Sequence, residues 1–281
     1  MASVLAETAP GAADNMMSSV AESNPEAALA VASAMAESNP MAAEGTAAAI
    51  ADSLPSLAAE AAGAMAAASP EAASEIAAGM AGSNPELAGE IANSMMSSVP
   101  EAAQGIAEGI ASSAPSQAAD VASSMAESNP EFAGEIAGGM AAGDPGQAAD
   151  IASSMVASNP DFAGDVAGGV AEFAPSMAAD VASSIVESNP EAATEMAVAM
   201  AESNPIAAGA AMGAMAEAAP EIATEAATAM AEANPDAAGF AAQSMADAVP
   251  ELAAEAATAM MEVAPDSAGA IAGGVARGDA D

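Results

Sequence analysis

Apolar and polar residues follow one short period along the whole chain. Every fifteenth residue from Pro10 to Pro265 is a proline, and all 18 prolines fall on this grid. With proline as position 1, Ala occupies position 4 in every unit, and Met, Ile or Val occupies position 11. At about 100° per residue, positions 4, 7, 8, 11 and 12 share one arc of a helix. The pattern therefore predicts one amphipathic α-helix in each unit.

The residues around each proline predict where these helices begin. Ser, Asn or Asp before proline is a favourable N-cap, and proline is favoured at the first helical position. One helix running through all the prolines is excluded, because a proline in a helix interior costs about 3 kcal/mol. Each unit is expected to be a helix of roughly 12 residues, about 18 Å long, followed by a tight turn. The predicted helix-start joints are Asn24, Pro25, Asn39, Pro40, Asn84, Pro85, Asn129, Pro130, Asn189 and Pro190.

Methionine is the commonest large apolar residue and recurs at position 11. The predicted core row contains Met35, Met65, Met80, Met95, Met125, Met140, Met200 and Met230. A row of thioethers also suits Cu(I). Val and Ile replace Met freely at this position, however, so the row is interpreted as helix-packing core.

Carboxylates prefer positions 2, 6 and 13, which lie within about 40° of each other, opposite the apolar arc. This acidic stripe includes Glu86, Glu90, Glu131, Glu135, Glu187, Glu191, Glu195, Glu251 and Glu255. The default interpretation is a solvated helix face. Weak multivalent binding of Ca²⁺ or mineral is an alternative, since oxygen ligands suit hard cations. Binding to ice by the small residues of the periodic face is a further alternative.

Short helices of this kind are marginal alone and need to stack. The sequence predicts an all-α solenoid of about 18 short helices, stacked as about nine antiparallel hairpins. The hairpin follows from an alternation between units, with Ala119 and Ala149 at position 5 of one class and Gly134 and Gly164 in the other. The alternation slips further along the chain, and a coil with more than two helices per turn is the other arrangement. Residues 1–281 are expected to form a single repeat domain, with a half repeat at 1–9 and full repeats from Pro10 to near Asp279.

Composition narrows the function classes. The chain has 40 Asp and Glu residues against one basic residue, Arg277, giving a formal net charge of −39. Without a cationic surface, nucleic-acid binding is not expected. With no His, Cys or Lys, a Ser-His-Asp triad, a thiolate metal site and a Walker lysine are all ruled out. Paired carboxylates remain, but no pair stands out, and we expect no enzymatic activity, no cofactor and no resident metal. The strong negative charge would suit a salt-rich habitat.

The sequence predicts a structural or scaffolding protein whose main partner is itself. Both ends keep the apolar pattern without an obvious polar cap, so we expect self-association end to end or side to side into a filament or layer. The alternative is a binding module that uses its periodic face for cations. The N-terminus has no basic region before an apolar run, and no 18-residue run is free of both charge and proline. We therefore expect no signal peptide and no membrane insertion, with a cytoplasmic location by default and non-classical export as the alternative.

Overall fold

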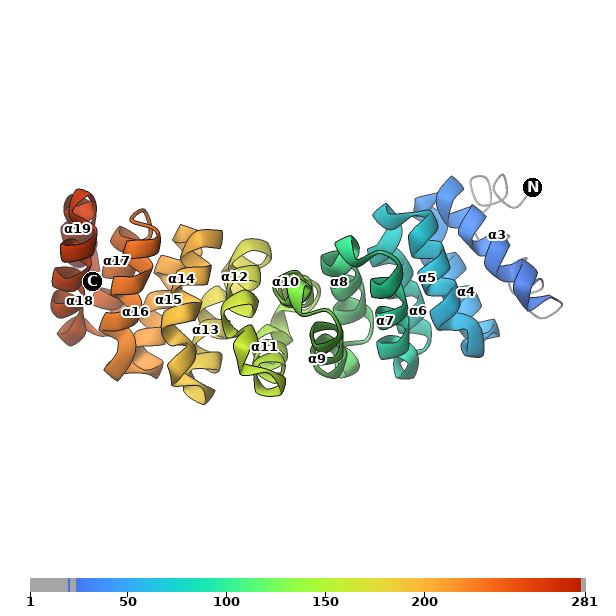
Figure 1. The fold of residues 1–281 in the computed structure, drawn as a ribbon, viewed down its shortest axis with the longest axis horizontal. Coiled ribbons are helices and arrows are strands. Elements are labelled where there is room, and N and C mark those ends of the chain that lie inside the picture. Colours follow the sequence, from blue (N-terminus) through green and yellow to red (C-terminus); the bar gives the residue numbers. More distant parts are fainter. Residues whose placement is uncertain (1–19, 21–23, 279–281) are drawn as a thin grey trace. The chain divides into compact units, whose positions relative to one another are not determined.

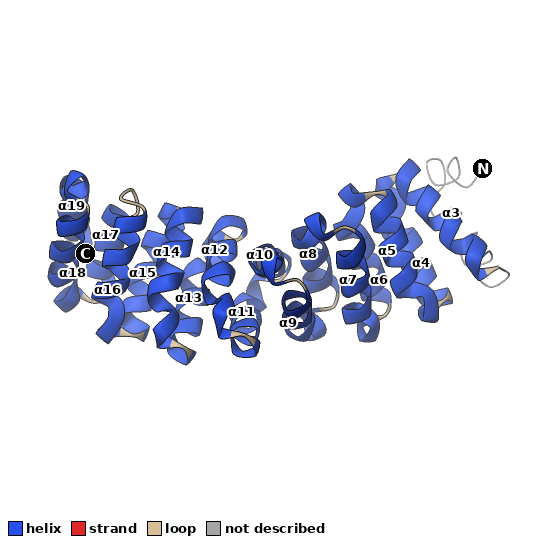
Figure 2. Ribbon diagram, in the orientation of Figure 1, coloured by secondary structure: helices blue, strands red, loops and turns tan. Residues whose placement is uncertain are grey.

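The computed structural model describes residue 20 and residues 24–278, and it contains no strand among these residues (Figures 1 and 2). The described α-helices are α3 (Pro25–Ser38), α4 (Ala43–Ser53), α5 (Ala58–Ala68), α6 (Ala73–Ser83), α7 (Ala88–Ser98), α8 (Ala103–Ser113), α9 (Ala118–Ser128), α10 (Ala133–Gly143), α11 (Ala148–Ser158), α12 (Ala163–Phe173), α13 (Ala178–Ser188), α14 (Ala193–Ser203), α15 (Pro205–Ala218), α16 (Pro220–Ala233), α17 (Ala238–Ala248), α18 (Pro250–Val263) and α19 (Ala268–Gly278). An all-α solenoid of tandem helical repeats is thereby confirmed. The half repeat at 1–9, the first repeat start at Pro10 and the repeat end near Asp279 lie outside the described residues.

Most units begin with a short 3-10 turn that leads into the α-helix. These turns are Pro40–Ala42, Pro55–Leu57, Pro70–Ala72, Pro85–Leu87, Pro100–Ala102, Pro115–Gln117, Pro130–Phe132, Pro145–Gln147, Pro160–Phe162, Pro175–Met177, Pro190–Ala192 and Pro265–Ser267. The three-residue turn and the 11-residue α-helix that follows, as in Pro40–Ala42 and α4, together fill all but one residue of the unit. The helical part is thus longer than the roughly 12 residues expected from the sequence, and the connection is shorter.

A single residue at position 15 joins most helical segments to the next, whereas residues 234–237 connect α16 to α17. Asn39 is representative, with φ −148° and ψ 85°. Its N–H donates to the Met35 carbonyl at 2.9 Å, and its carbonyl accepts from the Ala42 N–H at 3.0 Å. The same residue therefore ends one helix and starts the next through backbone bonds. The following proline favours this conformation, because it disfavours the helical region for the residue before it.

The core is formed by the apolar arc of each helix. Position 11 is buried in every unit from Met35 to Met260, and position 4 is buried from Ala28 to Ala253. Position 8 is likewise buried from Ala32 to Ala257. Each fully buried Met or Ile side chain stabilises the fold by about 1.5–3 kcal/mol relative to an exposed one. Because Ala contributes less area, the stack depends on these larger side chains and on close helix approach.

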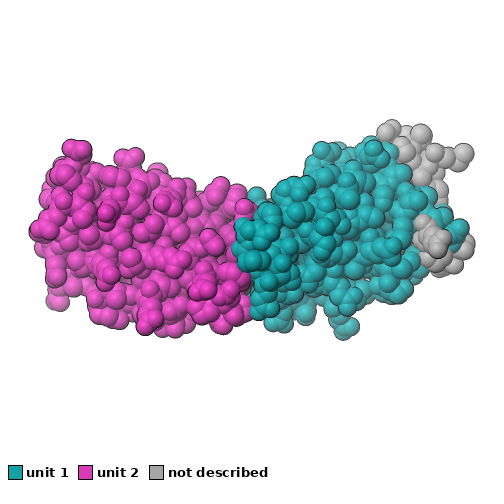
Figure 3. Space-filling view, viewed as in Figure 1, with its two compact units in different colours: residues 1–132, 142–144 teal, residues 133–141, 145–281 magenta. Residues whose placement is uncertain are grey.

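The chain divides into two compact units (Figure 3). The first comprises Met1–Phe132 with Ala142–Asp144, and the second comprises Ala133–Ala141 with Pro145–Asp281. In the first unit, α4 packs on α6 and α6 packs on α8, and each of these contacts is more extensive than that between consecutive helices. In the second unit, α15 packs on α17 and α17 on α19 in the same manner. The single-domain organisation expected from the unbroken grid stays a prediction.

Side-chain hydrogen bonds also join helices that are two 15-residue repeats apart. Asn93 of α7 donates to Ser124 of α9 at 3.1 Å, and the Ser153 and Ser184 hydroxyls of α11 and α13 lie 2.8 Å apart. Both pairs are separated by 31 residues in the sequence, which is two 15-residue units and one residue. Spatial neighbours across helices are therefore found two units apart.

Glycine at position 10 allows some of these helices to approach closely. A Cβ on Gly79 of α6 would overlap the backbone carbonyl of Glu44 in α4, with the carbonyl carbon only 2.9 Å away. A Cβ on Gly109 of α8 would meet the Ser74 carbonyl of α6 in the same way. Only a residue without Cβ fits such backbone contact. In this part of the first compact unit, glycine thus sets the spacing between helices that are two 15-residue repeats apart.

Candidate functional site

The sequence-predicted joints begin helical segments, but their side chains do not all act alike. The Asn24 Oδ1 accepts from the Ala27 N–H at 3.2 Å, which is an N-cap bond. At Asn39, Asn84 and Asn189 the side chain makes no cap hydrogen bond. Asn129 instead donates through Nδ2 to the Met125 carbonyl behind it, at 3.1 Å. Helix starts here rest on the proline and the backbone, with side-chain capping added at some units.

Two other asparagines cross-link helices that lie two units apart. Asn204 accepts from the Ala207 N–H at 3.2 Å, and its Nδ2 donates to the Ala171 carbonyl of α12 at 3.0 Å. Asn234 makes the equivalent bond to the Ala201 carbonyl of α14 at 2.7 Å. The donated bonds satisfy carbonyls near helix C-termini, which have no partner within their own helix. These joints are therefore structural clamps within the second unit.

The methionine row lies inside the helix stack. The side chains Met35, Met65, Met80, Met95, Met125, Met140, Met200 and Met230 are all fully buried. Met fills irregular gaps between helices because its unbranched side chain is flexible. The position that invited a soft-metal interpretation thus lies in the apolar core between helices.

The acidic stripe lies at the surface. Glu135 is half-buried, and the other members, Glu86, Glu90, Glu131, Glu187, Glu191, Glu195, Glu251 and Glu255, are exposed. Between α12 and α14, Asp165, Glu191, Glu195 and Glu202 line an open groove of about 520 Å³. Within the described residues, no three acidic side chains are grouped so as to hold a metal ion.

At one place in the second compact unit, large apolar side chains stand at repeat positions that usually carry a carboxylate. Ile206 at position 2 of α15 is 61% exposed, and Phe240 at position 6 of α17 is 44% exposed. Carboxylates are the commonest residues at both positions in the other repeats. The two side chains line one groove of about 270 Å³, together with Ala210, Gln243, Ser244 and Asp247. Exposed large apolar residues that share a hollow are the usual mark of a contact surface.

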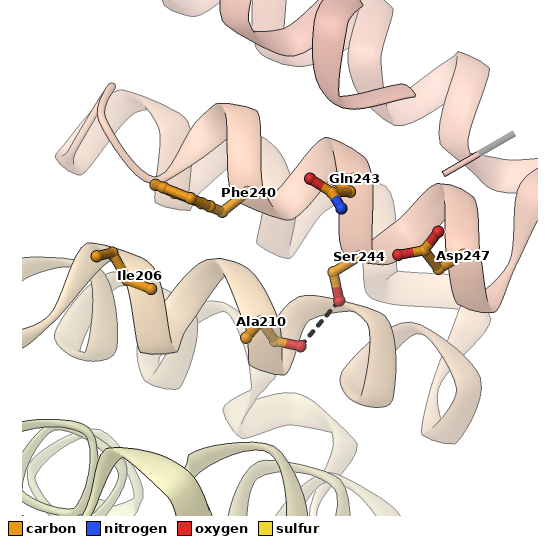
Figure 4. A pocket seen from close by; sticks show the side chains of 6 residues that line it. All are labelled: Ile206, Ala210, Phe240, Gln243, Ser244 and Asp247. Atoms are coloured by element: carbon orange, nitrogen blue, oxygen red, sulfur yellow. Dashed lines mark hydrogen bonds between the residues drawn. The ribbon is translucent and has the colours of Figure 1, made fainter. Parts of the chain in front are cut away.

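The groove has an apolar end and a polar end (Figure 4). Ile206 lies below the Phe240 ring at one end, while Gln243, Ser244 and Asp247 follow along α17 toward the other. The Ser244 hydroxyl accepts from the Gly213 N–H at 3.0 Å and donates to the Ala210 carbonyl at 2.8 Å. This hydroxyl therefore joins α17 to α15, and its position in the groove is fixed by the two hydrogen bonds.

The two other polar side chains of the groove differ in whether they are hydrogen-bonded to the protein. Gln243 accepts through Oε1 from the Arg277 Nε of α19 at 3.0 Å. The exposed Asp247 carboxylate makes no hydrogen bond or ion pair with any described residue. Asp247 is thus the charged group that this groove offers to an incoming molecule.

Sequence reasoning did not select this groove, although it carries a signal. Four aromatic residues are too few for a stacking platform, and their number alone does not point to a site. Aligning the repeats shows that Ile206 and Phe240 each break the acidic preference of their position. The two residues are 34 apart, and only the packing of helices two units apart reveals that they meet.

A second distinctive surface is the outer face of α19. Positions 8 and 12 are buried in helices α3–α17, but Ala272 and Ala276, at those positions in α19, are exposed. A Cβ added to Gly239 of α17 would lie 3.1 Å from the Ala270 Cβ of α19, whereas a Cβ added to Gly269 of α19 would have no atom within 4 Å. The α19 face therefore displays residues that elsewhere in the stack are covered by another helix.

No family model, curated protein or solved structure matches this chain. None of the described helices combines the length and the hydropathy that crossing a bilayer requires. The residues themselves must therefore support any proposal about function.

Proposed function

We propose that this protein is a non-enzymatic scaffold that self-associates through the exposed face of α19. The observation that supports it is the exposure of Ala272 and Ala276, at positions that are buried in helices α3–α17. A second copy of the chain is the proposed occupant, because it supplies helices of the same repeat and the same small side chains.

The interior of the second unit indicates what such an occupant would contact. Gly239 lies against Ala270 of the next stacked helix, and Gly209 lies against Phe240 in the same way. A helix placed on Gly269 would repeat this contact. Such a contact through unlike surfaces propagates into a filament if it does not close, whereas two α19 faces meeting each other give a dimer.

The proposed building block of the scaffold is an antiparallel two-helix hairpin of 30 residues, about nine of them in the chain. Support comes from the more extensive packing between helices two units apart, and from hydrogen bonds between residues 31–34 apart. Within each compact unit, alternate helices then form two layers, and each layer stacks on itself.

The non-enzymatic part of the proposal is supported by the residue inventory. The chain contains no His, Cys or Lys, which are the usual general bases, nucleophiles and Schiff-base residues. The carboxylates that remain follow the repeat, and among the described residues no three of them are placed so as to hold a metal ion.

Light scattering coupled to size exclusion tests the self-association. The chain is measured over a range of protein concentrations, at low salt and near 1 M NaCl, where the Debye length falls to about 3 Å. We expect a mass above the 26.4 kDa of one chain that grows with concentration at high salt, because screening relieves the repulsion between copies. A monomer at every salt and protein concentration would overturn the proposal.

A matched pair of variants locates the contact. Ala276→Glu adds a charge to the exposed α19 face, and Ser176→Glu adds the same charge at an exposed position 2 elsewhere in the second unit. Ala276→Glu should return the protein to monomer, and Ser176→Glu should leave the mass unchanged. Equal effects of the two variants would place the contact elsewhere.

A further inference from the structure

We propose that the groove between α15 and α17 binds a cationic amphipathic helix of another protein. The apolar side chain of that helix lies between Ile206 and Phe240, and a basic side chain meets Asp247. This site is separate from the α19 face through which the protein is proposed to self-associate.

Two large apolar side chains stand at this place of the second compact unit, at repeat positions where charge is common. Position 2 and position 6 carry Asp or Glu in most repeats, and such residues keep the helix faces solvated. Ile206 and Phe240 come from different helices but line the same groove, and both remain exposed. Two isolated apolar substitutions would not need to meet, whereas a contact surface requires it.

The groove is small. Its volume of about 270 Å³ lies close to the lower limit of the roughly 300–1,000 Å³ of pockets that enclose small molecules. It can accept one or two large side chains of a partner that lies along the surface. Grooves of this kind between helices typically receive the apolar face of another helix.

The charge of the chain selects a basic partner. The net charge is −39. The one basic side chain, Arg277, donates to the neutral Gln243 amide and keeps its positive charge beside the groove, so the attraction comes from Asp247 and from the many carboxylates of the rest of the chain. At low salt an acidic partner is repelled by this chain, whereas a partner with Lys or Arg is attracted. The unpaired Asp247 carboxylate gives this attraction a fixed position.

The spacing along α17 defines the partner further. Phe240 and Asp247 are seven residues apart on one helix, which corresponds to about 10.5 Å. A partner helix aligned with α17 would therefore present its large apolar residue and its basic residue about two turns apart. The distance selects an amphipathic helix that carries both features on one side.

Binding of a defined peptide tests this proposal. The probe is a synthetic helix of about 18 residues with Leu on one face and Lys at its edge, long enough to be helical in water. Its dissociation constant is measured by fluorescence anisotropy with the full chain, at low salt and near 1 M NaCl. We expect binding that persists at high salt, because part of it is apolar contact. Absence of binding, or binding that vanishes on screening, would overturn the proposal.

Phe240→Glu separates the groove from general attraction. The substitution restores the residue class common at position 6 and keeps the Cβ that packs against Gly209, so the fold is expected to persist. Non-specific attraction predicts equal or tighter binding of the cationic peptide, because the variant is more acidic. The groove predicts binding at least about tenfold weaker, equivalent to about 1.4 kcal/mol.

Two more variants complete the test. Ser176→Glu adds the same charge at an exposed site away from the groove and should not weaken binding. Asp247→Asn should weaken binding severalfold, since it removes the partner of the basic residue while keeping its shape. If Phe240→Glu and Ser176→Glu bind the peptide with the same affinity, the groove is not the binding site. If Asp247→Asn binds the peptide as tightly as the parent chain, Asp247 is not the partner of the basic residue.

Discussion

Among single residues, the fold depends on where side chains are missing as much as on where they pack. Ala, Gly and Ser dominate the helix faces that meet helices two units away, and backbones approach until a Cβ is sometimes excluded. Close approach increases dispersion contacts, each of which is small but numerous. Substitutions that add one methyl group should therefore have opposite effects at glycines that differ in their surroundings.

Gly79→Ala should destabilise the protein although Ala is the better helix former. Its Cβ would overlap the Glu44 carbonyl of α4, and such overpacking costs about 1–3 kcal/mol. Gly89→Ala in α7 is the matched control, because its nearest contact would be the Val121 side chain at 4.0 Å. The control should gain up to about 1 kcal/mol from helix propensity. Urea unfolding followed by circular dichroism measures both, and an increase in the Gly79→Ala midpoint would show that α4 and α6 are not in backbone contact.

At the scale of the helix, the repeating element is 15 residues long, and the residues at its two ends determine where the helix starts and stops. Proline fixes the start, and the single joint residue exchanges backbone hydrogen bonds with the segments on both sides. This explains why Leu54 and Val99 serve as joints without any capping side chain. Where asparagine bonds to a neighbouring helix as well, the joint becomes a stabilising contact between units.

Asn204→Ala should lower the local stability of the second unit. It removes the cap bond to Ala207 and the bond to the Ala171 carbonyl, with a combined cost of about 1–3 kcal/mol. Asn84→Ala is the comparison, because the Asn84 side chain makes no cap hydrogen bond, and it should cost less than about 0.5 kcal/mol. Amide hydrogen exchange in α12 and α15 reports the difference locally. Similar protection in the two variants would contradict the clamp.

Much of the element could be predicted from the sequence, because the proline grid and the apolar arc are local signals. Helix starts such as Pro40 and Pro85, and buried positions such as Met65 and Ile50, follow from a 100° rotation per residue. The one-residue joint could not be predicted, since it depends on backbone angles at position 15. The groove at Phe240 could not be predicted either, because helical periodicity fixes the face of a residue but not the helix that it meets.

Across the whole molecule, charge opposes the stack that small apolar residues build. Forty acidic residues and one basic residue leave almost no ion pairs to offset the repulsion. Carboxylates recur at exposed positions of the repeats, so compact states gather like charges that an unfolded chain would separate.

The protein should therefore become more stable as salt is added. Between about 0.01 M and 1 M NaCl the Debye length falls from about 30 Å to about 3 Å, and repulsion between neighbouring units is screened. We expect the thermal midpoint measured by circular dichroism to rise over this range, with much of the rise complete by about 0.1 M. A midpoint that is flat or that falls with salt would show that the carboxylates do not destabilise the fold.

Within each compact unit the arrangement rests on one relation, in which helices two 15-residue repeats apart pack on each other. The chain has no cysteine, so engineered pairs can be tested without interference. Ser153 and Ser184 have hydroxyls 2.8 Å apart, so cysteines at these two positions would bring their sulfur atoms close together. Ser184→Cys with Ala199→Cys is the control pair, at the same repeat position but only one unit apart.

The decisive measurement is mild oxidation of the two double variants, with the fraction of intramolecular disulfide quantified by mass spectrometry. Stacking of helices two units apart predicts rapid, near-complete closure for the Ser153→Cys, Ser184→Cys pair and little closure for the control pair. Closure of the control pair in preference to the 31-residue pair, or closure of neither, would show that these helices are not neighbours.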